Sequence, residues 1–208
     1  MIHPLAKHKE FAPLIKKHGP PQLRRGKNIF QALCRSIISQ QVSGKAAVSI
    51  FAKFTALFPD KKFPEPQDVL DTPFEVLRSA GLSGQKATYI TDLAQKFSDG
   101  TIDVKKITKM SSDELVEYLA QVKGVGVWTV HMLLIFTLGR PDVLPTGDLG
   151  IRKGFQIVYG IKTLPSPKAI ERFAKPWREY ASAASWYLWR AADNAPVAKK
   201  YRPEKTNH

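Results

Sequence analysis

The sequence of 208 residues has a single cysteine, Cys34, and no long hydrophobic run. One cysteine excludes an intrachain disulfide, a four-cysteine zinc site and a four-cysteine iron–sulfur cluster. The longest apolar stretch, residues 127–138, is too short to cross a bilayer, and residues 1–10 lack the apolar core of a signal peptide. We therefore expect an intracellular protein with no membrane partner and no bound cofactor, in the cytoplasm or nucleoid of a prokaryote or the nucleus of a eukaryote.

Acidic residues are also scarce relative to basic ones. The 18 Asp and Glu residues are outnumbered by 32 Lys and Arg residues, which gives a formal net charge of +14. The basic residues recur along the whole length rather than in one tail, a distribution typical of a folded protein that binds a polyanion. Hydrophobic residues make up 43% of the chain and charged residues 24%, so we expect a globular rather than a disordered protein.

No segment shows the apolar–polar alternation of a β-strand. Apolar residues instead recur at helical spacing, between turns that contain Gly or Pro, which predicts an all-α protein of about ten helices. The more specific expectations are a helix over residues 3–18, a surface loop over 59–68, a helix capped by Thr72, a lysine-rich loop over 105–109, an unbroken helix over 127–138 and a last helix over 177–193.

A glycine turn between two helices lies in the middle of the chain. Ser111 and Glu114 form a capping-box pattern that begins a short amphipathic helix. Gly124 and Gly126 then break that helix into a tight turn, and residues 127–138 predict a second, almost wholly apolar helix.

This turn is a candidate phosphate clamp. The successive backbone amides of Gly124, Val125 and Gly126 lie beside the positive end of the second helix dipole, which favours an anion. Lys123 adds a positive charge and Thr129 adds a hydroxyl donor. The expected ligand is a backbone phosphate, bound without reading the base sequence. A tight corner between two helices, with no ligand, is the alternative interpretation.

Four stretches of the chain, taken together, resemble a known superfamily. They are RSIISQQVS at 35–43, LRSAGLSGQKA at 77–87, LAQVKGVGVWTV at 119–130 with LPTGDLGIRKG at 144–154, and KPWREYASAASWY at 175–187. In this order they resemble the helix-hairpin-helix (HhH-GPD) superfamily of DNA glycosylases. Within it, the chain is similar to the 3-methyladenine DNA glycosylase II branch, which excises alkylated bases.

The resemblance implies a fold of two helical lobes with the active site in the cleft between them. Residues 30–143 would form a helical barrel that ends in the hairpin, and residues 1–29 and 144–208 the second lobe. The implied partner is duplex DNA that contains alkylated bases, and we expect the protein to be a monomer.

The implied reaction is hydrolysis of the N-glycosidic bond of alkylated purines such as 3-methyladenine and 7-methylguanine. It leaves an abasic site for base excision repair. Two alternatives stay open. A glycosylase for hypoxanthine, etheno-adenine or uracil would share these motifs, and a non-catalytic binder of damaged or bent DNA would retain the fold.

Two carboxylates are candidates for the catalytic group, because Asp142 and Asp148 are the acidic residues between Glu117 and Glu171. Asp142 follows a proline in a turn, and Asp148 could simply cap the helix over residues 149–159. The family's catalytic aspartate falls on Asp148. Cleavage of the bond develops positive charge on the sugar, which a fixed anion stabilises, and the carboxylate can orient or deprotonate water.

The resemblance also assigns the base pocket. The family's pocket tryptophans fall on Trp128 and Trp186, whose electron-rich indoles suit a cationic base. Packing against the other lobe is the alternative role for Trp186. Other branches carry a nucleophilic lysine at the position of Trp128, so we expect neither a Schiff base nor lyase activity. Met132 and Leu149 stand where the family has aromatic pocket residues, which leaves the lesion range open.

Residues 39–43 match the family's wedge loop, which fills the gap left by an extruded base. Its tip falls on Gln41, whose amide can stack on or hydrogen-bond with the orphaned partner base. Gln40 and Ser43 are assigned to DNA binding with it. An ordinary turn between two helices is the alternative.

Two further candidate binding sites use backbone groups. The turn from Gly81 to Gly84, with Lys86, is a candidate second grip on DNA, and a plain helix start is the alternative. The family often holds a monovalent cation on hairpin carbonyls, which here are those of Ala120, Val122 and Val125. No side-chain metal site is expected.

Overall fold

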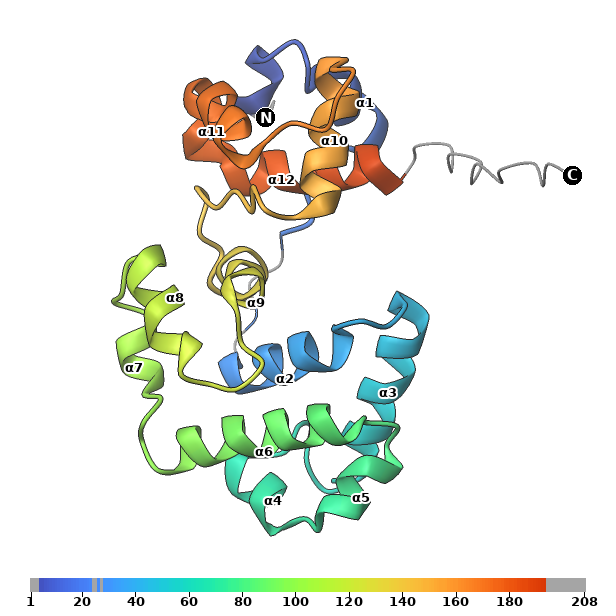
Figure 1. The fold of residues 1–208 in the computed structure, drawn as a ribbon, viewed down its shortest axis with the longest axis vertical. Coiled ribbons are helices and arrows are strands. Elements are labelled where there is room, and N and C mark those ends of the chain that lie inside the picture. The colour runs from blue at the N-terminus through green and yellow to red at the C-terminus, as the bar shows by residue number, and fades with distance from the viewer. Residues whose placement is uncertain (1–3, 24–25, 27, 194–208) are drawn as a thin grey trace, which may run out of the picture. The chain divides into compact units, whose positions relative to one another are not determined.

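The computed structural model describes residues 4–23, 26 and 28–193 (Figure 1). Every regular element within these residues is helical, which confirms the expected all-α class. The chain divides into a central unit, residues 22–145, and a terminal unit, residues 1–21 and 146–208. The sequence assigned residues 22–29 to the terminal lobe. In the structure the Gly26 amide donates to the Phe136 carbonyl (3.3 Å), which ties this connector to the central unit.

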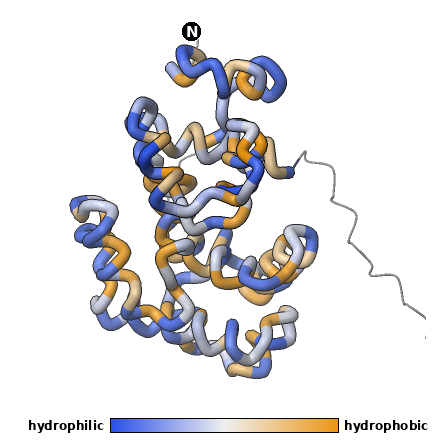
Figure 2. The backbone as a smooth tube through the Cα atoms, turned by 45° about the horizontal axis from the view of Figure 1, so that its top comes forward, coloured by the Kyte–Doolittle hydropathy of each residue, from blue (hydrophilic) through white to orange (hydrophobic). Residues whose placement is uncertain are grey.

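The central unit is a bundle of amphipathic helices around an apolar core. Its elements are α2 (Ile29–Ser39), α3 (Gly44–Ala56), α4 (Pro66–Asp71), α5 (Phe74–Ser79), α6 (Gly84–Ser98), α7 (Val104–Ile107), α8 (Ser112–Ala120), α9 (Val127–Leu133) and a π-helical turn (Leu134–Leu138). Helix α2 contacts α3, α6 and α9 and buries Leu33, Cys34 and Ile37. Burial raises the pKa of the Cys34 thiol, as expected of an inert core cysteine. Figure 2 shows hydrophobic and hydrophilic residues alternating along the helices.

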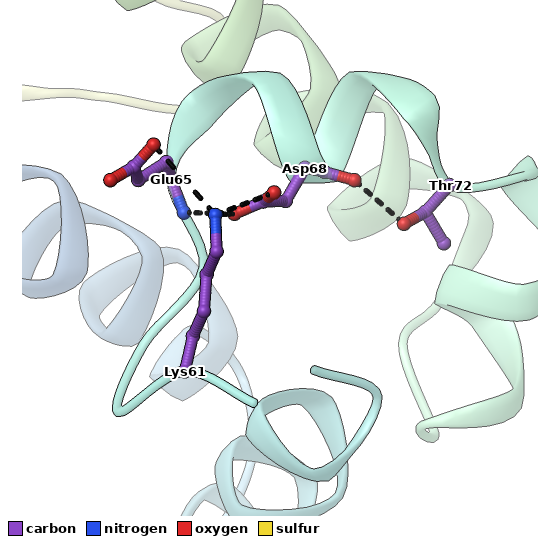
Figure 3. Close-up of polar contacts among 4 residues, drawn as sticks. All are labelled: Lys61, Glu65, Asp68 and Thr72. Atoms are coloured by element: carbon purple, nitrogen blue, oxygen red, sulfur yellow. Dashed lines mark hydrogen bonds and ion pairs between the residues drawn. The ribbon is translucent and has the colours of Figure 1, made fainter. Parts of the chain in front are cut away.

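Residues 59–65 form the expected loop, but α4 begins at Pro66, so the loop ends earlier than the predicted bound of 68. Glu65 and Asp68 form a capping box, and Pro66 takes the first helical position, where its missing amide is not needed. Lys61 donates to Asp68 (2.8 Å), as Figure 3 shows. Thr72 does not cap the next helix: it ends α4 and donates to the Asp68 carbonyl, and Pro73 precedes α5.

Three further expectations differ from the structure. The lysine-rich loop contains the short helix α7, capped by Asp103. The helix over residues 127–138 changes at Leu134 from α9 into the π-helical turn. The helix over residues 3–18 divides into a 3₁₀ turn, Pro4–Lys7, and α1 (Ala12–His18). Pro13 explains this division, since proline is tolerated in the first helical turn but not in the interior.

The terminal unit combines both ends of the described chain. Besides the 3₁₀ turn and α1 it contains α10 (Leu149–Tyr159), α11 (Pro167–Ala174), a 3₁₀ segment (Lys175–Tyr180) and α12 (Ala181–Asp193). The last helix therefore begins at Ala181 rather than at Trp177, whose backbone is non-helical (φ −126°, ψ 21°). Tyr187 donates to the Gly19 carbonyl (2.8 Å) and joins α12 to the end of α1. None of the described helices is long and apolar enough to span a bilayer.

Candidate active site and nucleic-acid interface

The glycine turn of the hairpin is built so that only glycine fits at position 124. Gly124 has φ +78°, in the left-handed region, and a Cβ there would lie 2.1 Å from Cδ2 of Tyr89 on α6. The Val125 amide donates to the Val122 carbonyl (3.0 Å) and closes the turn. Gly126 then precedes α9 with an ordinary φ of −110°, and a Cβ there would have nothing within 4 Å.

Asp92 on α6 anchors the start of this turn. Its Oδ2 accepts the Lys123 amide (2.9 Å) and its Oδ1 accepts the Lys96 ammonium (2.7 Å). Burial opposes ionisation of this carboxyl, but hydrogen bonds from Lys96 and Lys123 outweigh that effect and lower its pKa below the ordinary value. The Lys123 ammonium lies 3.9 Å from Asp92 and its side chain stays 65% exposed, so it remains accessible to an anion.

The hairpin offers fewer donors than the sequence suggested. The Val125 amide is used inside the turn. Thr129 is 2% exposed, with its hydroxyl 3.5 Å from the Gln40 amide nitrogen, so it is not presented to a ligand. The donors left for a phosphate are the amides of Gly124 and Gly126, for which the described residues provide no acceptor, and the Lys123 ammonium.

Two residues expected to contact DNA donate hydrogen bonds to backbone carbonyls next to the candidate wedge loop. The Gln40 side-chain amide donates to the Gly124 carbonyl (2.8 Å), which joins the loop to the hairpin. Lys86 donates through Nζ to the Ile38 carbonyl (2.7 Å) at the end of α2. Desolvation in this position lowers the pKa of Lys86. Both side chains are half-buried and help to position the loop, and their contact with DNA stays a prediction.

Gln41 at the tip is exposed and has φ +56°, the single positive φ among described non-glycine residues. A glutamine in this left-handed region is strained by about 1–2 kcal/mol. Strain of this kind gathers at functional sites, where the surrounding structure maintains it. The hydrogen bond of Gln40 to the hairpin and that of Lys86 to the Ile38 carbonyl hold the residues just before Gln41 and supply that support.

Replacing Gln41 with glycine separates the local strain from the proposed wedge function. We expect Gln41→Gly to keep the free energy of unfolding or raise it by up to about 1 kcal/mol, because glycine adopts the left-handed region freely. We expect excision from duplex DNA to fall about tenfold, with single strands unaffected, since an orphaned base exists only in a duplex. Urea unfolding and single-turnover excision measure the two effects. Equal losses on both substrates would contradict the wedge assignment.

The other two predicted DNA-binding residues lie at helix starts. The Ser43 hydroxyl accepts the Ala46 amide (3.3 Å) and caps α3. Gly84 is the first residue of α6, after its cap Ser83, and a Cβ there would have nothing within 4 Å. Ser43 is exposed and Gly84 partly so; their contact with DNA stays a prediction.

A cavity of about 600 Å³ in the central unit joins two predicted pocket residues. Trp128 and Met132, one turn apart on α9, both line it. Trp128 is 42% exposed, so part of the residue is accessible from solvent. Arg35 and Ser36 of α2 also line the cavity. The sequence did not indicate them as pocket residues, because the apolar spacing of their helix predicts a helix packed in the core.

Asp148 is the N-cap of α10, as one sequence alternative proposed. Its Oδ1 accepts the Ile151 amide (2.8 Å). The same oxygen accepts the indole N–H of Trp189 on α12 (2.9 Å), a contact that the sequence gave no reason to expect. Asp142 lies in an exposed turn of the central unit. Asp148 is thus the candidate carboxylate that the fold holds in a defined position.

The two remaining pocket candidates lie in the terminal unit. Leu149 is 53% exposed at the start of α10, whereas Trp186 is only 8% exposed. The Trp186 ring meets His18 and Tyr187 edge-on, and the Arg190 guanidinium lies 5.0 Å from its centroid. The sequence placed Trp186 off the core face of its helix. That inference is wrong, because residues 181–188 are all buried and α12 has no outer face there.

The carbonyls proposed for a monovalent cation lie at the end of α8 and in the turn. Ala120 is the last residue of α8, where carbonyls lack intrahelical partners and the helix dipole is negative. The Val122 carbonyl already accepts the Val125 amide but keeps a second lone pair. Within the described residues no cluster of three or more His, Cys, Asp or Glu could hold a metal ion.

Two helices joined by a glycine turn, in a basic all-α chain with a carboxylate fixed at a helix start, define a helix-hairpin-helix protein. The model of the HhH-GPD superfamily of base excision DNA repair proteins matches residues 34–179. The chain therefore belongs to the HhH-GPD superfamily, as the four sequence stretches indicated.

Proteins of this family resemble the chain over most of its length. DNA-3-methyladenine glycosylase 1 of Schizosaccharomyces pombe is 34% identical over 198 residues, which cover 95% of this chain and 87% of that protein. The 3-methyladenine DNA glycosylase of the same yeast in complex with abasic DNA matches with a TM-score of 0.80 at 34% identity, over 89% of this chain and 92% of that one. A DNA-3-methyladenine glycosidase from Bacillus halodurans matches with a TM-score of 0.79 at 33% identity, over 91% and 87%.

Proposed function

We propose that the protein is a monofunctional, monomeric DNA glycosylase of the 3-methyladenine DNA glycosylase II type. It hydrolyses the N-glycosidic bond of alkylated purines in duplex DNA and leaves an abasic site for base excision repair. The family and its similar relatives support this activity. The observation that supports the chemistry is the fixed position of the Asp148 carboxylate, which accepts a hydrogen bond from the Ile151 amide at the start of α10.

Asp148 acts on the sugar. As the bond to the base lengthens, positive charge develops on the deoxyribose, and a carboxylate fixed in advance stabilises that charge without reorganising. The bonding electrons leave with the base, which is a good leaving group because alkylation has made it cationic. Water then adds to the sugar carbon, and Asp148 accepts its proton.

The central unit supplies the grip on DNA. The amides of Gly124 and Gly126 bind one backbone phosphate beside the positive end of α9, and the exposed Lys123 ammonium reinforces them. Gln41 at the loop tip fills the space of the extruded base. Because phosphate contacts of a chain with net charge +14 dominate affinity, binding weakens steeply as salt rises.

The cavity beside α9 receives the extruded base. The open surface of the Trp128 indole attracts a cationic purine through its π-electrons. Met132 lines the same cavity with a flexible thioether in place of a ring. A pocket with one exposed indole and an adaptable wall favours positive charge over a defined hydrogen-bond pattern. This supports alkylated purines over neutral bases such as uracil.

The carbonyls of Ala120, Val122 and Val125 fit a monovalent cation, since oxygen ligands at a helix C-terminus favour positive charge. A bound cation would reinforce the turn and add positive charge beside the phosphate. It takes no part in bond cleavage.

An excision assay tests the function and the absence of lyase activity together. We expect the purified protein to release 3-methyladenine and 7-methylguanine from alkylated duplex DNA. We expect strand breaks only after alkali or heat, because Trp128 provides no amine for a Schiff base. Released bases are measured by chromatography, and intact strands by gel electrophoresis before and after alkali.

The same assay on duplexes with hypoxanthine, etheno-adenine or uracil separates the alternative substrates. Strand breakage before alkali would contradict monofunctional action. Failure to release any base would leave the non-catalytic binder as the function.

A further inference from the structure

Trp189 on α12 (Ala181–Asp193) contacts the candidate catalytic carboxylate from another helix. Its indole N–H donates to Asp148 Oδ1 at 2.9 Å. The Ile151 amide donates to the same oxygen at 2.8 Å. The amide belongs to the helix that Asp148 caps, whereas the indole comes from α12.

Two donors on one oxygen constrain the carboxylate more than a cap alone does. The χ2 torsion of aspartate has a broad, roughly two-fold energy profile, so one cap bond leaves the carboxylate plane free to turn. A second donor that approaches Oδ1 from a different helix removes this freedom. The orientation of Asp148 therefore depends on the contact between α10 and α12, and not only on the local start of a helix.

Two glycines of α10 allow it to approach α12 closely. A Cβ on Gly150 would lie 2.8 Å from Trp189 Cδ1 and 3.2 Å from Nε1. A Cβ on Gly154 would lie 2.0 Å from the Leu188 carbonyl oxygen. Gly150 and Gly154 lie one turn apart on the same face of α10, and α10 and α12 lie side by side (Figure 1). The glycines thus bring the indole ring onto the first turn of α10.

Trp177 lies in the same unit as Trp189, but its indole N–H does not donate to Asp148. Its ring is almost completely buried, 1% exposed, and its N–H donates to the Tyr159 hydroxyl at 3.0 Å, away from Asp148. Trp189 is only partly buried, and its N–H is directed at the carboxylate. The two indoles donate to different acceptors, Trp177 to a hydroxyl and Trp189 to a carboxylate.

We propose that Trp189 is a positioning residue, whose indole N–H holds Asp148 in the orientation that faces the deoxyribose during bond cleavage. This proposal rests on the proposed role of Asp148. Trp189 acts through the carboxylate and does not contact the reacting atoms.

The test compares two substitutions that separate the hydrogen bond from the packing. Trp189→Phe keeps a large ring but removes the donor. Trp189→His removes ring volume but keeps an N–H, because its Nε2 occupies the place of the indole Nε1 in a five-membered ring. We expect the single-turnover excision rate of Trp189→Phe to fall by about 10- to 100-fold. We expect Trp189→His to be faster than Trp189→Phe although it is the less stable protein.

The matched control is Trp177→Phe, which also removes one indole hydrogen bond from the terminal unit. It should lower the Tm and leave the single-turnover rate, measured well below that Tm, within about twofold of wild type. Affinity for an abasic-site duplex should stay within about twofold in all three variants, because the DNA grip lies in the central unit.

The positioning role is overturned if Trp189→Phe keeps its single-turnover rate within about twofold of wild type. It is also overturned if the rates of the two Trp189 variants follow their Tm values. Asp148→Asn, measured alongside, separates this proposal from the proposed function. If Asp148→Asn excises bases normally, the role of Asp148 fails and that of Trp189 with it. If only Asp148→Asn is inactive, the positioning proposal fails alone.

Discussion

Substituting Asp148 with asparagine is expected to lower the single-turnover rate of base excision by about 100- to 1,000-fold, while the fold and DNA binding persist. Asparagine is as good an N-cap as aspartate, and its oxygen can still accept the Ile151 amide and the Trp189 indole. It lacks the negative charge that stabilises the developing cation on the sugar. Excision kinetics on a duplex with 7-methylguanine, circular dichroism and affinity for an abasic-site duplex measure the three properties.

Asp142→Asn is the matched control, because it removes one negative charge from an exposed turn without touching α10. We expect its excision rate to equal that of the wild type. If the two variants lose activity to the same extent, net charge rather than a fixed carboxylate limits the reaction. If neither loses activity, Asp148 is only a helix cap.

Gly124→Ala is expected to destabilise the hairpin strongly and to weaken DNA binding with it. The backbone is at φ +78°, and the new Cβ would be 2.1 Å from the Tyr89 ring. A strained backbone and a ring that must move cost together about 2–4 kcal/mol of the free energy of unfolding. Urea unfolding followed by circular dichroism measures the loss, and fluorescence anisotropy with labelled duplex measures affinity.

Gly126→Ala is compared with this variant because it tests the phosphate clamp separately from the stability of the hairpin. Its φ is −110° and its Cβ would have nothing within 4 Å, so we expect the Tm to change little. We expect affinity for duplex DNA to fall about tenfold, because a methyl group at the start of α9 hinders the approach of a phosphate to the amides. Unchanged affinity for Gly126→Ala would show that the hairpin is a structural corner and not a phosphate clamp.

Local sequence was sufficient where one segment carries its own signal. The capping box of Ser111 and Glu114 forms as predicted, and so does the cap of Asp148 on α10. The glycine turn also forms where it was expected. These features need only hydrogen bonds within three or four residues, so the sequence contains all the partners. The resemblance of the four stretches to the superfamily predicted the fold and the class of reaction.

Only the tertiary structure decided which side chains face a ligand. The sequence assigned Gln40, Lys86 and Thr129 to DNA. In the structure Thr129 is buried, whereas Gln40 and Lys86 are half-buried and donate to the carbonyls of Gly124 and Ile38. Trp186 is buried because α12 is surrounded by other elements, which no helical stripe on its own can show. Trp189 meets Asp148 across 41 positions of chain. A side chain's direction in the folded protein depends on its neighbours in space, and those neighbours are set by how the helices pack rather than by the order of the residues.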